Sequence, residues 1–94
     1  MDNRQEATQI LFEGVREAFA EWNPIGVPPD IAIGEYDGYV WQVISRLQRG
    51  ESAEEVEKYL THVVVDQMGL RYHESIADAA DRLVAIYRNW TENQ

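Results

Sequence analysis

The sequence predicts a small all-α fold of four helices, with an ordered proline-rich loop between the first helix and the second. Apolar residues recur at the 3.6-residue spacing of an α-helix in four segments. A strand pattern is absent, except in residues 27–33, where prolines argue against strand pairing. The chain has 94 residues, which is the length of one domain, so residues 1–94 are expected to form a single helical domain.

The first helix is expected to run from about Asn3 to Trp22. Asn23 precedes Pro24. A proline disfavours helical backbone at the residue before it, so the helix should stop at Asn23. The apolar stripe of this helix consists of Ala7, Leu11, Val15, Phe19 and Trp22.

The proline-rich loop follows in the segment EWNPIGVPPDIAIGEYDGYVW, residues 21–41, which holds all three prolines and no cationic side chain. Prolines stiffen a connection and reduce the entropy that it loses on docking. The loop is also too apolar to be fully solvated, so it should cover one end of the bundle with Ile25, Val27, Ile31 and Ile33. Four side chains are expected to pack together there: Trp22, Ile25, Val27 and Tyr36.

The second helix is expected to begin near Gly34 or Glu35 and to end at Gly50, because glycine is the preferred residue just after a helix. Its buried stripe should be Tyr36, Tyr39, Val40, Val43 and Leu47.

The third and fourth helices are predicted from their start signals. Ser52 and Glu55 form a capping box that opens the third helix, which Gly69 closes. Ser75 and Asp78 resemble a second cap and should open the fourth helix. The apolar stripe of the third helix is Val56, Leu60, Val63, Val64 and Met68. The stripe of the fourth helix is Ile76, Ala79, Ala80, Leu83, Tyr87 and Trp90.

Charge and composition exclude several classes of function. Seventeen acidic side chains oppose eight basic ones, giving a net charge of −9 with no basic patch. Binding to nucleic acid or to an anionic membrane needs concentrated positive charge, so neither is an expected partner. Without cysteine there is no disulfide framework, thiolate metal site or cysteine nucleophile. With no signal-peptide pattern and no apolar run of about 20 residues, the expected location is the cytoplasm.

Several short segments together resemble a family of small, uncharacterised helical bacterial proteins, a domain of unknown function. They are EWNPIGV, EYDGYV, a Gly-Glu-Ser-x-Glu-Glu-x-x-x-Tyr-Leu segment and DQMGL, within roughly residues 10–70. Family members typically show Trp-Asp-Pro-hydrophobic-Gly, Glu-Tyr-Asp-x-Tyr and Met-Gly-Leu segments, and this chain has Asn23 where the usual residue is Asp. The resemblance implies a bacterial, cytoplasmic, helical protein and brings no established activity with it.

One group of residues raises the question of a metal or catalytic site. His62 and Asp66 lie four residues apart on one helical face, and His73 and Glu74 follow after a turn. Two histidines and two carboxylates could surround a divalent metal. Their spacing matches no zinc motif, however, and polar residues on the exposed side of a helix explain them better. We therefore expect no enzymatic activity, no metal and no cofactor.

A second acidic group follows the prolines and consists of Asp30, Glu35 and Asp37. It lacks the alternating ligands of an EF-hand loop. Glu35 and Asp37 should fall in the first turn of the second helix, where carboxylates meet the positive end of the helix dipole.

A hypothesis of partner binding rests on apolar residues outside the stripes. Ile10, Trp41 and Val65 project away from the main apolar faces of their helices; Trp41 has the alternative of packing beneath the proline-rich loop. If the three were exposed together among acids, they would form an apolar centre with a charged rim. The candidate partner-binding residues are Asp30, Glu35, Asp37, Trp41, Ile10 and Val65.

The predicted function is that of a small acidic protein-interaction module. Its partner would be a basic protein such as a toxin or nuclease, so that the chain acts as an inhibitor or immunity-like protein. The alternative is a homo-oligomeric structural or regulatory module without catalytic activity, in which the partner is a second copy of the chain.

Overall fold

The computed structural model describes residues 3–93, with side chains described from Glu6 onward. These residues form helices and no strands, which confirms the all-α prediction. The prediction of four helices is wrong, because a short helix lies within the proline-rich segment and the third helix ends in a separate π-helical segment. The elements are α1 (Asn3–Trp22), α2 (Pro29–Glu35), α3 (Asp37–Gln48), α4 (Ala53–Thr61), the π-helix η1 (His62–Gln67) and α5 (Ser75–Glu92).

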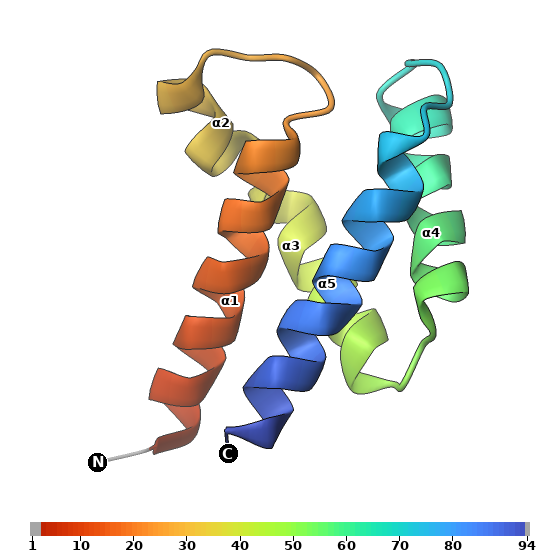
Figure 1. The fold of residues 1–94 in the computed structure, drawn as a ribbon. Helices are drawn as coiled ribbons and strands as arrows, with labels where there is room; N and C mark the ends of the chain where they lie inside the picture. The colour runs from red at the N-terminus through yellow and green to blue at the C-terminus, as the bar shows by residue number, and fades with distance from the viewer. Residues whose placement is uncertain (1–2, 94) are drawn as a thin grey trace.

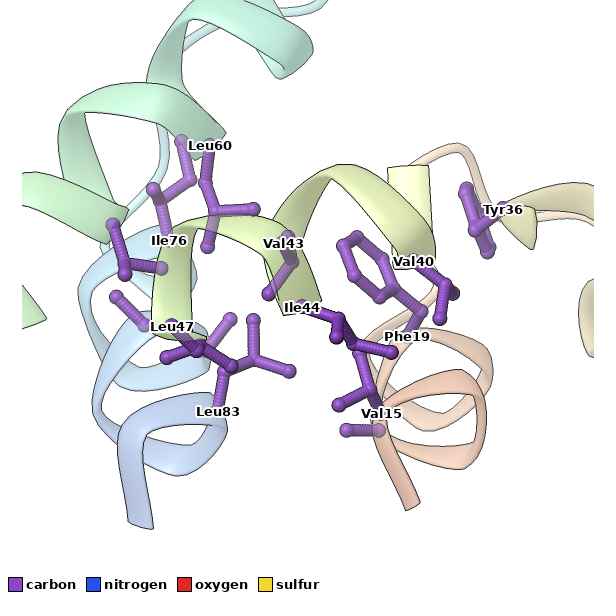
Figure 2. Close-up of a cluster of buried hydrophobic side chains, with 14 of the residues drawn as sticks. Val15, Phe19, Tyr36, Val40, Val43, Ile44, Leu47, Leu60, Ile76 and Leu83 are labelled. Atoms are coloured by element: carbon purple, nitrogen blue, oxygen red, sulfur yellow. The ribbon is translucent and has the colours of Figure 1, made fainter. Parts of the chain in front are cut away.

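The long helices form a bundle in which α5 lies between α1 and α4 and runs antiparallel to both (Figure 1). The short α2 packs against α1, at the end where α1 meets the proline-rich segment. Figure 2 shows α3 between α1 on one side and α4 and α5 on the other. Within the described residues, no helix is both long and apolar enough to cross a bilayer.

One cluster of apolar side chains holds these helices together. Ten of its members are labelled in Figure 2: Val15, Phe19, Tyr36, Val40, Val43, Ile44, Leu47, Leu60, Ile76 and Leu83. Leu11, Phe19, Val40, Leu60 and Leu83, one or more from each long stripe, are each at most 1% exposed. The stripes that helical periodicity predicts are therefore the faces that the fold buries.

The second predicted helix begins later than expected but ends as expected. Tyr36 has φ −102° and ψ 8°, which interrupts the helix, so that α2 ends before Tyr36 and α3 begins after it. At the other end Gly50 has φ +84°, a backbone conformation that glycine adopts without steric cost. Its N–H donates to the Leu47 carbonyl at 3.0 Å, and the Glu51 N–H reaches the Arg46 carbonyl at 3.3 Å, which closes α3.

The capping box at the start of α4 is confirmed. The Glu55 N–H donates to Ser52 Oγ at 3.2 Å, and the Ser52 N–H donates to Glu55 Oε1 at 3.3 Å. Two N–H groups that the helix leaves unpaired are thus satisfied by side chains.

We expect Ser52→Ala to lower the free energy of unfolding by about 1 kcal/mol, because the Glu55 N–H loses its acceptor. Urea denaturation followed by circular dichroism measures this loss. Ser45→Ala is the matched control: Ser45 is exposed in α3 and its hydroxyl has no hydrogen bond to any described residue. The control should stay within about 0.5 kcal/mol of the parent. Equal stability of Ser52→Ala and the parent would contradict the role of this cap.

The third predicted helix changes its winding before it reaches Gly69. After α4 the chain continues as the π-helix η1, whose closing bond runs from the Met68 N–H to the Val63 carbonyl, five residues back, at 2.8 Å. Val63 and Val64 are both buried here although they are adjacent in sequence. Gly69, with φ +70°, then ends the helix as predicted.

The prediction that Ser75 caps the last helix is wrong. The residue before α5 is Glu74, and no side chain caps the helix from that position. Ser75 Oγ instead accepts a hydrogen bond from Trp22 Nε1 of α1 at 3.0 Å. A half-buried indole N–H needs an acceptor, and this hydroxyl supplies it. The Ser75 N–H in turn donates to His73 Nδ1 at 3.0 Å.

Candidate functional site

The α2 segment, defined as residues 25–35, begins after a tightly bonded turn. Asn23 ends α1 with φ +47°, in the left-handed region that asparagine tolerates better than most residues. Its Nδ2 donates to the Val27 carbonyl at 2.8 Å, and its Oδ1 accepts from the Val27 N–H at 3.1 Å. The Tyr36 hydroxyl also donates to Asn23 Oδ1 at 2.7 Å and accepts from the Ile25 N–H at 3.0 Å. The side chains of Asn23 and Tyr36 therefore connect the turn at residues 23–27 to the start of α3.

The Tyr36 side chain is buried. Burial raises the pKa of its phenol because the charged phenolate is poorly solvated there. The hydrogen bond from the Ile25 N–H lowers this pKa, and the neighbouring Glu35 charge raises it. The hydroxyl therefore keeps its proton and remains a donor to Asn23 at neutral pH.

The expectation that four aliphatic side chains cover the end of the bundle is largely wrong. Ile25 is 42% exposed, and Ile31 and Ile33 are each 49% exposed. The α2 helix instead buries Ala32 against the core. Because neighbouring helical residues point about 100° apart, Ile31 and Ile33 then lie on the two flanks of that contact and face solvent.

The packing predicted around this turn is present in part. The rings of Trp22 and Tyr36 both pack on Phe19, with centroid distances of 5.8 Å and 5.9 Å. Val27 is half-buried against the core. Ile25 contributes its backbone N–H to the cluster but leaves its side chain exposed.

Asp30 and Glu35 are exposed at the two ends of α2. Among the side chains that the structure describes, from Glu6 onward, neither carboxylate has a hydrogen-bond or ion-pair partner. Glu35 lies four residues after Ile31 and shares its flank of the helix. The α2 segment thus presents half-exposed isoleucines beside two carboxylates that the fold does not use.

Asp37 and Trp41 lie elsewhere, at the contact of α3 with α1. Arg16 Nε donates to Asp37 Oδ1 at 2.9 Å. The Trp41 ring stacks on Phe12 with a centroid distance of 4.7 Å and an interplanar angle of 28°. Phe12 lies in α1, about three helical turns before the proline-rich segment. Trp41 therefore packs on α1. Asp37 occupies the first turn of α3, as predicted, but Arg16 already neutralises its charge. The same prediction is wrong for Glu35, which is the last residue of α2.

Ile10 and Val65 do not join Trp41 in one patch. The exposed fractions are 64% for Ile10, 52% for Trp41 and 37% for Val65. Ile10 precedes Phe12 by two residues, so the two side chains leave α1 in different directions. Val65 belongs to η1, which continues α4 on the opposite side of α5 from α1 (Figure 1). The six candidate residues therefore occupy at least four separate places.

The two histidines have different hydrogen-bond partners. His62 Nδ1 lies 2.8 Å from Asp66 Oδ2, whereas His73 Nδ1 accepts from the Ser75 N–H. In the part of the chain with described side chains, no three residues of the types His, Asp and Glu come together as a metal site would require.

The structure also contains a polar groove that the sequence did not predict. Tyr39, Gln42 and Arg46 of α3 and Tyr59, His62 and Gln67 line a hollow of about 700 Å³, and Glu35 at the end of α2 also lines it. The Arg46 guanidinium lies 4.2 Å from the centre of the Tyr59 ring and 3.2 Å from a Glu51 carboxylate oxygen. Its charge is therefore already compensated, and the groove offers less to an anionic ligand than its composition suggests. Burial raises the pKa of Tyr59, with Arg46 opposing the shift.

No protein-family model, curated protein or solved structure matches the chain. The resemblance to small bacterial proteins therefore depends on the short sequence segments quoted above.

Proposed function

We propose that this chain is a small acidic protein-interaction module that binds a basic partner protein through the α2 segment. The observation that carries the proposal is the exposure of Ile25, Ile31 and Ile33 beside the carboxylates of Asp30 and Glu35. An inhibitor or immunity-like action on a basic toxin or nuclease is the specific form of this function. A bacterial, cytoplasmic setting, which the family resemblance implies, belongs to the same proposal.

The two kinds of side chain would contribute differently to binding. Completing the burial of a half-exposed isoleucine stabilises a complex by about 1 kcal/mol. The carboxylates, together with the net charge of −9, would attract a basic partner and accelerate its association. An apolar contact surrounded by charge is typical of protein interfaces.

A second copy of the chain is a less suitable partner for the α2 segment. A two-fold interface places identical surfaces against each other, so Asp30 and Glu35 of one copy would approach the same carboxylates of the other. Repulsion between like charges opposes such a dimer.

The homo-oligomeric alternative has support at one place, the contact of α1 with α3. Arg16 and Asp37 neutralise each other there, beside the half-exposed Trp41 on Phe12. Sedimentation of the parent and of Trp41→Ala tests this alternative. We expect a monomer in both cases; a parental dimer that Trp41→Ala dissociates would favour the homo-oligomeric module.

We expect the double substitution Asp30→Lys and Glu35→Lys to abolish retention of a basic partner. The control carries the same change of charge elsewhere, through Glu17→Lys on α1 and Asp81→Lys on α5, both exposed positions. Proteins retained from a cell extract by the parent and the control, and lost by the double variant, identify the partner by mass spectrometry. The association rate of the purified partner should fall about tenfold for the double variant at low salt, and this difference should shrink as salt is added.

Equal effects of the two double variants would contradict a role of the α2 segment. So would a partner of acidic rather than basic charge. Ile31→Ser provides an independent test, because loss of apolar contact should accelerate dissociation rather than slow association.

A further inference from the structure

A hollow between α1 and α5 is lined by residues outside the α2 segment. Its volume of about 320 Å³ is at the lower end of the range for small-ligand sites. Ala18 of α1 and Ala79 of α5 are among the residues that line it. Both are buried, and their side chains are small. They belong to α1 and α5, which lie side by side and antiparallel (Figure 1).

The wall of the hollow is aromatic and held in position. Trp22 lines it, and two contacts orient the indole of this residue. Its Nε1 donates to Ser75 Oγ at 3.0 Å, and its ring packs on Phe19 at a centroid distance of 5.8 Å. Ring faces of this kind attract another aromatic ring and also a cation.

The rim of the hollow carries an excess of negative charge. Arg82 of α5 reaches across to Glu21 of α1, with Nη2 2.6 Å from Oε2. Asp78 lies one turn before Arg82 on α5 and also lines the hollow. Its carboxylate has no ion pair or hydrogen bond to any residue with a described side chain, residues 6–93. Two carboxylates and one guanidinium leave one uncompensated negative charge.

We infer that this hollow binds an aromatic ring that carries a cationic group. The ring rests against Trp22 above the two alanines, and the cation pairs with Asp78. The same cation competes with Arg82 for Glu21, so Arg82 acts as an internal competitor that limits affinity. This inference does not depend on the proposed role of the α2 segment.

Tryptamine is the probe, and indole-3-propionate is its control because it has the same ring and the opposite charge. Titration of the full chain, followed by ¹H–¹⁵N NMR, should shift the Trp22 indole N–H and the first turns of α5. For a ligand of this size we expect a Kd on the order of 1 mM. The carboxylate should bind at least about fivefold more weakly. Equal binding of the two compounds, or shifts elsewhere in the chain, would overturn the inference.

Three substitutions assign the site, and two of them change exposed residues that the core does not need. Asp78→Asn should weaken tryptamine binding about two- to fivefold, the range for a partly exposed ion pair. Arg82→Gln should strengthen it by a similar factor, because Glu21 becomes available. Ala79→Leu should fill the hollow and abolish binding. Weaker binding after Arg82→Gln would contradict the competition between Arg82 and the ligand.

The same ligand chemistry could come from a free aromatic amine or from a peptide with an aromatic residue next to lysine. Titration with acetyl-Trp-Lys-amide distinguishes them. Tighter binding of this peptide than of tryptamine assigns the hollow to an anchor residue of a protein, and tighter binding of tryptamine assigns it to a small amine. Failure of both to bind overturns the inference.

Discussion

Leu60→Ala is expected to lower the free energy of unfolding by about 2–5 kcal/mol, which is the range for removing a large aliphatic side chain from a packed core. Leu60 is completely buried in α4. It belongs to the same cluster as Ile76 and Leu83 of α5 (Figure 2), and α4 has a more extensive contact with α5 than with α3. Truncation would therefore leave a cavity at the interface that attaches α4 to the rest of the bundle.

Urea unfolding followed by circular dichroism measures this loss as a lower midpoint with an unchanged slope. Val65→Ala is the matched control, because Val65 is a partly exposed aliphatic residue on η1. The control should cost about 0.5 kcal/mol. A loss below about 0.5 kcal/mol for Leu60→Ala would place this residue outside the core and contradict the buried stripe of α4.

The long helices were predictable because the apolar spacing that indicates them is local and repeats along each helix. In α1 the spacing of Leu11, Val15 and Phe19 indicates both the helix and the face that it buries. The cap of α4 was predictable for the same reason, since Ser52 and Glu55 interact within a single turn.

The short helix α2 was not predictable from such patterns. Seven residues are too few to form a stable helix alone, and two consecutive prolines indicate a loop. Pro29, however, stands at the first helical position, where a missing N–H costs nothing. What stabilises this helix is packing on α1 through Ala32, a contact that no local pattern reveals.

The sequence did not predict the contacts that join residues far apart along the chain. Arg16 and Asp37 are 21 residues apart, and Trp22 and Ser75 are 53 residues apart. The first pair places a cation of the chain itself beside Asp37, and the second gives the Ser75 hydroxyl a partner on α1. Sequence reasoning selected Asp30 and Glu35 by charge alone, whereas the isoleucines beside them become surface residues through the fold of α2.

Asn23→Ala should lower the free energy of unfolding by about 2–4 kcal/mol, the second largest effect that we expect. The substitution removes the acceptor of the Tyr36 hydroxyl and of the Val27 N–H, and a lost hydrogen bond in a part-buried place costs about 1 kcal/mol or more. It also places alanine at φ +47°, where the Cβ atom adds about 1–2 kcal/mol of strain.

Two further substitutions at Asn23 separate these causes. Asn23→Gly removes the side chain without the backbone strain, so it should cost less than Asn23→Ala. Asn23→Asp keeps an acceptor for Tyr36 and Val27 and loses the donor to the Val27 carbonyl, so it should cost least. Denaturant unfolding of all three measures the order; equal stability of the alanine and aspartate variants would contradict a role of the side-chain hydrogen bonds.

The same variants connect the turn to the function proposed for the α2 segment. Because Asn23 and Tyr36 hold the turn that precedes α2, Asn23→Ala should release α2 from α1 before the bundle unfolds. The amide protons of Ile31 and Ile33 should then exchange faster than in the parent, and proteases should cleave within residues 24–34, while Leu60 and Leu83 stay protected. Unchanged exchange at Ile31 and Ile33 would mean that α2 is held by Ala32 alone. Faster exchange would instead mean that the turn holds the isoleucines in place. An ordered surface loses less entropy on binding, so this order would favour the proposed contact with a partner.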